Sequence, residues 1–77
     1  MNPRGRLLHI FALVFGREVG ADLTREDPDW DSVRHIEILT AVMEEFEVQF
    51  GADEIGGLTS FAAILAAVER QLAARGG

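Results

Sequence analysis

Apolar residues recur every three or four positions in three separate segments of this chain, and nowhere do they alternate with polar residues for long enough to form a strand. This spacing is typical of amphipathic helices and predicts one helix from about residue 3 to 15 and a second from Ser32 to about Phe46. A last helix is expected to begin after Thr59 or Ser60, either of which can cap free backbone amides. The sequence therefore predicts an all-α fold.

Each predicted helix has a row of apolar residues that identifies its buried side. A helix places residues three and four positions apart on one side, so such a row marks the surface that packs against the rest of the protein. The predicted core rows are Leu7, Leu8, Phe11, Val14 and Phe15 in the first helix, Ile38, Leu39, Val42 and Phe46 in the second, and Phe61, Ile64, Leu65, Val68 and Leu72 in the last.

The first connection is long and carries turn residues. Gly16 is expected to end the first helix, and residues 17–31 show no sustained periodicity, which predicts a long ordered loop. Val19, Leu23 and Trp30 are expected to attach this loop to the core.

The second connection contains "ADEIGG", residues 52–57, which permits only one or two helical turns. Gly56 and Gly57 each weaken a helix by about 1 kcal/mol relative to alanine, so a short third helix is expected there. The complete prediction is a small four-helix bundle in a single domain, residues 1–77. It has three main helices, one short helix and a long loop between the first two.

The composition excludes several classes of protein. The chain has 77 residues and no cysteine, so its core must come from the 48% of hydrophobic residues, without disulfides or thiolate metal sites. Its only histidines are His9 and His35, and it has neither the G-x-S-x-G elbow of a serine hydrolase nor a zinc-ligand spacing such as H-E-x-x-H. We therefore expect a protein that is not an enzyme and has no metal site.

Charge and hydropathy indicate the kind of partner. Thirteen acidic residues and seven arginines give a net charge of −6, and eleven of the acids lie between residues 22 and 54. This distribution disfavours nucleic acid and favours basic protein surfaces. The apolar stretch "LLHIFALVF" is nine residues long with an internal histidine, too short to span a membrane. A cytoplasmic location is expected.

The stretch "DPDWDSVRHIEIL" places Ser32 directly before the periodic segment of the second helix. On this local pattern alone, Ser32 is predicted to be the N-cap that accepts hydrogen bonds from free amides. Without a suitable histidine and oxyanion site it is not expected to be a hydrolase nucleophile. It can accept a phosphate-linked group, because the N-terminus of a helix stabilises negative charge.

A longer stretch around this serine, "DSVRHIEILTAVMEEFEVQFGADEIGGLTSFAAIL", covers residues 31–65. It resembles the centre and end of an acyl carrier protein, a family in which an Asp-Ser-Leu signature carries 4′-phosphopantetheine on its serine. "IEI" at 36–38 resembles the family's Val-Glu-Leu, and "EEF" at 44–46 and "TSF" at 59–61 also match. The resemblance covers about half of the chain by motif and the rest by helical architecture.

This resemblance implies a carrier role. Ser32 would be the attachment site of covalent 4′-phosphopantetheine, and Asp31 would help a phosphopantetheinyl transferase to recognise it. The thiol of the arm would hold acyl or aminoacyl groups as thioesters for a loading enzyme and for ketosynthase- or acyltransferase-type partners with basic surfaces. The chain would be a non-catalytic monomer. Trp30 before the signature and His35 after it are similar to discrete carriers of polyketide or related specialised biosynthesis.

A second row on the predicted second helix indicates where these partners bind. The helix has more apolar residues than one buried side can account for. In the family that the chain resembles, partner enzymes contact this side of the helix, next to the serine. We expect Ile36 and Met43 to be partly exposed within a ring of acids. The row consists of Val33, Ile36, Thr40, Met43 and Glu47, flanked by Glu37 and Glu44.

The resemblance also implies an apolar shelter for the acyl chain between the second, third and last helices. Val42, Leu58 and Ile64 are its candidates, and each equally fits an ordinary core. His35, one turn from Ser32, is expected to be a packed, structural histidine, with a contact to the phosphate as the alternative.

Two alternatives stand beside a carrier of specialised metabolism. A housekeeping fatty-acid carrier would share the fold, but Arg34 and Met43 interrupt the acidic face of the second helix. Val33, in place of the family's usual leucine after the serine, is a mild departure that keeps an apolar contact for partners. An unmodified helical interaction module, in which Ser32 is only a cap, would share the small size and acidity. Covalent modification of Ser32 distinguishes the carriers from the module.

Overall fold

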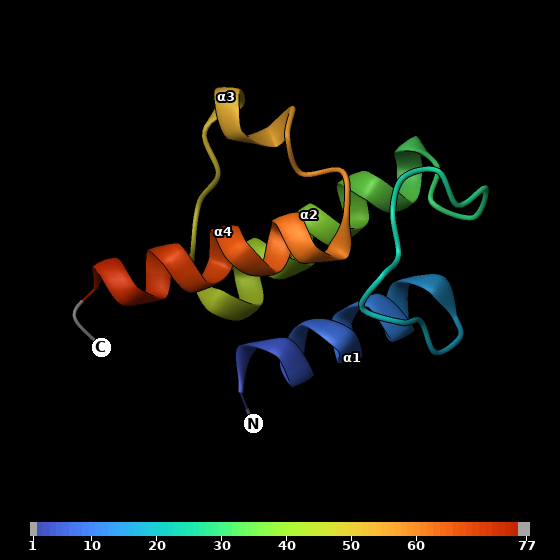
Figure 1. The fold of residues 1–77 in the computed structure, drawn as a ribbon, viewed down its shortest axis with the longest axis horizontal. Coiled ribbons are helices and arrows are strands. Elements are labelled where there is room, and N and C mark those ends of the chain that lie inside the picture. The colour runs from blue at the N-terminus through green and yellow to red at the C-terminus, as the bar shows by residue number, and fades with distance from the viewer. Residues whose placement is uncertain (1, 76–77) are drawn as a thin grey trace.

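Four α-helices and their connections make up residues 2–75, the part of the chain that the computed structural model describes. The helices are α1 (Pro3–Phe15), α2 (Ser32–Phe46), α3 (Ala52–Ile55) and α4 (Phe61–Ala74). In Figure 1, α1, α2 and α4 lie together, and the short α3 stands apart at the top of the view. Residues 2–75 contain one isolated β-bridge and no strand, so the predicted small all-α bundle with a long first loop is confirmed.

The helix ends follow local signals in the sequence. Asn2 caps α1 by accepting a hydrogen bond from the N–H of Gly5 at 2.8 Å, which satisfies one free amide of the first turn. Gly16 ends α1 as predicted, with a φ of 71° that glycine adopts without steric cost. Ser60 caps α4, because its Oγ accepts a hydrogen bond from the N–H of Ala63 at 3.0 Å.

The core lies between the three main helices and consists largely of the predicted rows. All four residues of the predicted row in α2 are buried. Leu8, Val14, Leu65 and Leu72 are only partly buried and lie at the edge of the core. The buried residues are Leu7, Ile10, Phe11, Phe15, Trp30, Ile38, Leu39, Val42, Phe46, Val48, Phe50, Leu58, Phe61, Ile64, Ala67 and Val68.

An aromatic cluster joins the long loop to α1 and α4. Trp30, near the end of the loop, is buried, and its ring packs edge-on against Phe11 and Phe15 at centroid distances of 5.4 and 6.2 Å. Phe11 also packs edge-on against Phe61 of α4 at 5.1 Å. Such pairs contribute about 0.5–1.5 kcal/mol each beyond the area that they bury. Trp30 therefore attaches the loop to the core, as predicted.

Backbone hydrogen bonds also tie the long loop to the start of α4. The N–H of Arg25 donates to the carbonyl of Thr59 at 2.9 Å, and the N–H of Phe61 donates to the carbonyl of Leu23 at 2.9 Å. The isolated β-bridge forms at the same place. These contacts order the loop, whose last residues lead directly into α2.

Candidate functional site

The candidate site lies where the long loop enters α2. Asp31 is the N-cap of α2: its backbone is extended, and its Oδ1 accepts a hydrogen bond from the N–H of Arg34 at 2.8 Å. Ser32 is the first residue of the helix, so the prediction that Ser32 is the N-cap is wrong. The carboxylate at position 31 reaches the amide three residues ahead, which leaves the Ser32 hydroxyl without a capping role.

The two serines of the chain have different environments, although both lie at the start of a helix. Ser60 uses its Oγ to cap α4 and is partly buried. Ser32 is exposed and takes no part in capping α2. Ser32 therefore presents the more accessible hydroxyl.

The guanidinium of Arg34 forms an ion pair with the carboxylate of Asp31. Its Nη1 lies 3.3 Å from Oδ2 of Asp31, and its guanidinium lies over the ring of Phe15 in α1, 6.0 Å from the centroid. Met43, the other residue expected to interrupt the acidic face of α2, is half-buried against the core. Both side chains are partly exposed, so the expectation that they interrupt the acidic face of α2 stays a prediction.

His35 accepts a hydrogen bond from the side chain of Trp30. The indole Nε1–H donates a hydrogen bond to Nδ1 of His35 at 3.0 Å, and the two ring centroids are 5.8 Å apart. Partial burial lowers the pKa of His35 from its usual 6.5, and the positive charge of Arg25 lowers it further. Because the indole can only donate, the imidazole is neutral with its proton on Nε2. His35 is packed against Trp30 as predicted, and the alternative contact with the phosphate stays a prediction.

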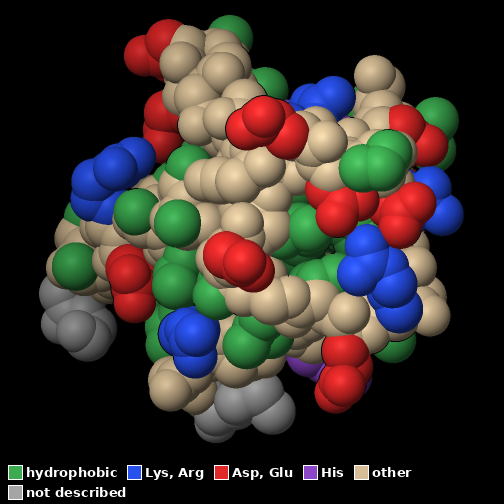
Figure 2. Space-filling model, turned by 45° about the vertical axis from the view of Figure 1, so that its right-hand side comes forward, with side chains coloured by type: hydrophobic (Ala, Val, Ile, Leu, Met, Phe, Trp, Pro, Cys, Tyr) green, Lys and Arg blue, Asp and Glu red, His purple; other side chains and the backbone are tan. Residues whose placement is uncertain are grey.

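The predicted partner row lies on the exposed side of α2, beside Ser32. Val33 and Ile36 are 68% and 65% exposed, whereas Met43 is half-buried, so the expected partial exposure of Ile36 and Met43 is confirmed. Figure 2 shows a face of the molecule on which acidic groups are interspersed with hydrophobic side chains. The remaining members of the row and its flanks, all exposed, are Glu37, Thr40, Glu44 and Glu47.

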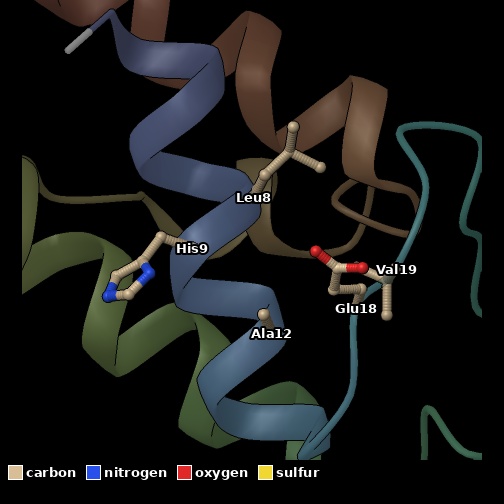
Figure 3. Close-up of a pocket in the computed structure, with 5 residues that line it drawn as sticks. All are labelled: Leu8, His9, Ala12, Glu18 and Val19. Carbon is tan, nitrogen blue, oxygen red and sulfur yellow. The ribbon is translucent and has the colours of Figure 1, made fainter.

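A depression between α1 and the first residues of the long loop contains two titratable side chains that do not meet. Leu8, His9, Ala12, Glu18 and Val19 line it. Figure 3 shows His9 on the side of α1 that is turned toward α2, whereas Glu18 comes from the loop on the other side. His9 and Glu18 therefore do not form an acid–base pair.

The candidates for an acyl shelter lie in the core. Val42 and Ile64 are fully buried, and Leu58 is nearly so. A surface depression between α3 and α4 reaches Leu58 and Ala67. An acyl chain that entered there would have to displace packed side chains, so a sheltering role for the three residues stays a prediction.

No helix within residues 2–75 has the length and hydropathy needed to cross a membrane. Comparison of the chain with protein-family models gave no match, and comparison with curated proteins gave none. The motif around Ser32 and the geometry of the start of α2 therefore carry the functional inference.

Proposed function

We propose that this chain is a stand-alone carrier protein of the acyl carrier type, with 4′-phosphopantetheine attached to Ser32. The observation that carries the proposal is the position of Ser32. It presents an exposed hydroxyl at the first residue of α2, directly after a capping aspartate, within a stretch that resembles the family signature. The carrier is not itself a catalyst; the thiol of the arm supplies the thioester chemistry.

The attachment is a phosphopantetheinyl transfer from coenzyme A. Oγ of Ser32 attacks the β-phosphorus and forms a new P–O bond, the pyrophosphate P–O bond breaks, and 3′,5′-ADP leaves. A base of the transferase accepts the serine proton. The chain contributes the N–H groups of the first turn of α2 and the positive end of its dipole, which favour the phosphodiester charge. Asp31 holds this turn through its hydrogen bond to the N–H of Arg34.

The exposed side of α2 is the proposed docking surface for partner enzymes. Val33 and Ile36 are contiguous apolar side chains on a protein surface, and such groups mark interaction sites. Exposed acids around them raise the association rate of basic partners, and the apolar centre slows dissociation. The partners are a phosphopantetheinyl transferase, a loading enzyme, and ketosynthase- or acyltransferase-type enzymes.

The residues that flank the signature favour polyketide-type or related specialised biosynthesis. Trp30 and His35, which are hydrogen-bonded to each other, are similar to residues at these places in discrete specialised carriers. A housekeeping fatty-acid carrier is the alternative within the same fold. The enzymes encoded by neighbouring genes distinguish the two.

Intact-mass spectrometry tests the proposal after incubation of the chain with coenzyme A, Mg²⁺ and a promiscuous phosphopantetheinyl transferase. The wild type should gain one phosphopantetheinyl group, and Ser32→Ala should gain none. Ser60→Ala is the matched control, because it removes the other serine at a helix start and should still be modified. An unmodified wild type would favour the interaction module, and full modification of Ser32→Ala would place the group elsewhere.

A further inference from the structure

A groove between α1 and α2 carries the most exposed large apolar side chain within residues 2–75. Leu13 is 70% exposed and borders two adjoining depressions that also share Ile10 and Glu45. Ile10 is buried, and Ala41 of α2 lines the same groove. A single exposed leucine is common on protein surfaces, so its surroundings decide whether it has a role.

Leu13 lies toward the end of α1 that is next to the start of α2. At one end of the helix pair, Arg6 contacts the carboxylate of Glu45 through Nη2 at 2.8 Å and Nε at 3.1 Å. At the other end, the guanidinium of Arg34 lies over Phe15. The two helices are therefore antiparallel. Leu13, two residues before Phe15, lies toward the end of α1 that faces the start of α2, and the groove extends from there along the second half of α2 to Ala41, Glu44 and Glu45.

Two acids separate this groove from the exposed apolar group of Val33 and Ile36. Glu44 lines the groove, and Glu37, seven residues earlier in α2, lies on the same side of the helix. Both are exposed, whereas Glu45 is already in an ion pair. Glu37 and Glu44 thus form an acidic ridge with an apolar surface on each side.

A specific interface buries about 800 Å² on each partner, which is about a sixth of the 4685 Å² accessible surface of this protein. A partner centred on Ser32 and Ile36 therefore also covers a neighbouring element. Across the acidic ridge, that element is α1 with Leu13.

We propose that the docking surface straddles the acidic ridge and reaches α1, where Leu13 is a second apolar contact. Its occupant is the phosphopantetheinyl transferase, whose basic side chains meet Glu37 and Glu44 and whose apolar side chains lie on either side of them. This inference rests on the proposed function, because the transferase has to reach Ser32. The docking surface predicted from the sequence lies on α2 alone, whereas the surface proposed here also includes Leu13 of α1.

The test measures kcat/KM for phosphopantetheinylation of the full chain by a promiscuous transferase with coenzyme A. Leu13→Ala should lower kcat/KM about tenfold through a higher KM, as expected for truncation of an interface contact. Leu13→Met should stay close to wild type, because it keeps an apolar side chain of similar volume. Ile55→Ala is the matched control, since it truncates another exposed apolar side chain, on α3, and should leave kcat/KM unchanged.

Thermal melts of the Leu13 variants should coincide with wild type, because this side chain is 70% exposed. Ile55 is 37% exposed, so the melt of Ile55→Ala checks that this control is folded at the assay temperature. A wild type that is not modified overturns the proposed function, and this inference with it. A modified wild type that Leu13→Ala matches in kcat/KM overturns the inference alone. An equal loss in Ile55→Ala also overturns it, because the effect would then not be specific to the groove.

Discussion

At the scale of single residues, the cap of α2 is Asp31 and not Ser32, to which the local pattern assigns it. Asp31 provides the cap, so the hydroxyl of Ser32 is not needed to hold the first turn of α2. A group attached to a capping hydroxyl would disturb the cap. The proposed modification of Ser32 would therefore not need to break the hydrogen bond between Asp31 and Arg34 that caps α2.

Asp31→Ala should lower the free energy of unfolding by about 0.5–2 kcal/mol, because the N–H of Arg34 loses its acceptor. Ser32→Ala should change it by less than about 0.5 kcal/mol, as is usual for an exposed side chain without such a contact. Urea denaturation measures both variants, with Asp31→Asn as the control that keeps a capping oxygen. Equal losses in the two alanine variants would show that Ser32 contributes to the cap.

His35 makes the stability of the protein depend on pH. Its pKa is lowered in the folded protein, so between that value and 6.5 the unfolded chain binds more protons than the folded one. The stabilisation is fully present above pH 6.5 and is lost as pH falls through the lowered pKa. Protonation also removes the acceptor of the Trp30 indole, so the loop should loosen in the same window.

Equilibrium unfolding from about pH 7.5 to 5.5, followed by the fluorescence of the single tryptophan, measures this effect. The free energy of unfolding of the wild type should fall toward the acidic end. His35→Asn, which keeps an acceptor oxygen but does not titrate, should show a flatter profile. Parallel profiles for the two proteins would mean that other groups cause the dependence.

At the scale of elements, the helices could be predicted because their signals are local. Gly16 and Ser60 end and begin helices through contacts within a few residues. The core rows were found by spacing, and the same spacing applied to Ile10, three residues after Leu7, would have added it. Val48 and Phe50 could not be found in this way. They lie in the turn after α2, outside any helical row, and are buried by packing.

The site was less predictable than the fold. Two adjacent residues, Asp31 and Ser32, are both good caps, and the local pattern does not decide between them. The groove beside Leu13 depends on the packing of α1 against α2, which no local spacing reports. The contact of the Arg34 guanidinium with Phe15, nineteen positions away in the sequence, depends on the same packing.

Substitution of Phe46 tests which side of α2 is buried. Its side chain is buried, and the guanidinium of Arg6 lies 4.4 Å from the ring centroid. Phe46→Ala should lower the free energy of unfolding by about 3–5 kcal/mol, because it leaves a cavity. Val33→Ala on the exposed side of the same helix is the control and should change it by less than about 0.5 kcal/mol. Chemical denaturation that finds similar losses would mean that α2 is rotated about its axis.

At the scale of the whole molecule, part of the acidic charge is used internally and part is left for partners. Arg17 pairs with Asp27 and Asp29, and Arg70 pairs with Glu54. Within residues 2–75, the exposed acids Glu37 and Glu44 of α2 and Glu47, which directly follows α2, form no such ion pair. The negative electrostatic potential of these unpaired carboxylates can therefore attract a basic protein.

Replacing Glu37 and Glu44 together with arginine should slow association with the transferase and weaken its dependence on ionic strength. Ile36→Ala should mainly speed dissociation, because it removes an exposed apolar contact. Stopped-flow binding at two ionic strengths measures both effects, and thermal melts should change little. Variants that unfold but still bind normally would show that this row belongs to the core.

Fragment-ion mass spectrometry of the chain isolated from its own cells tests the carrier function most directly. We expect 4′-phosphopantetheine on Ser32, partly with an acyl or aminoacyl group held as a thioester on its thiol. Ser60 is the internal comparison and should be unmodified, because its hydroxyl caps α4 and is partly buried. A chain without the group, or with the group on Ser60, would contradict the proposed carrier function.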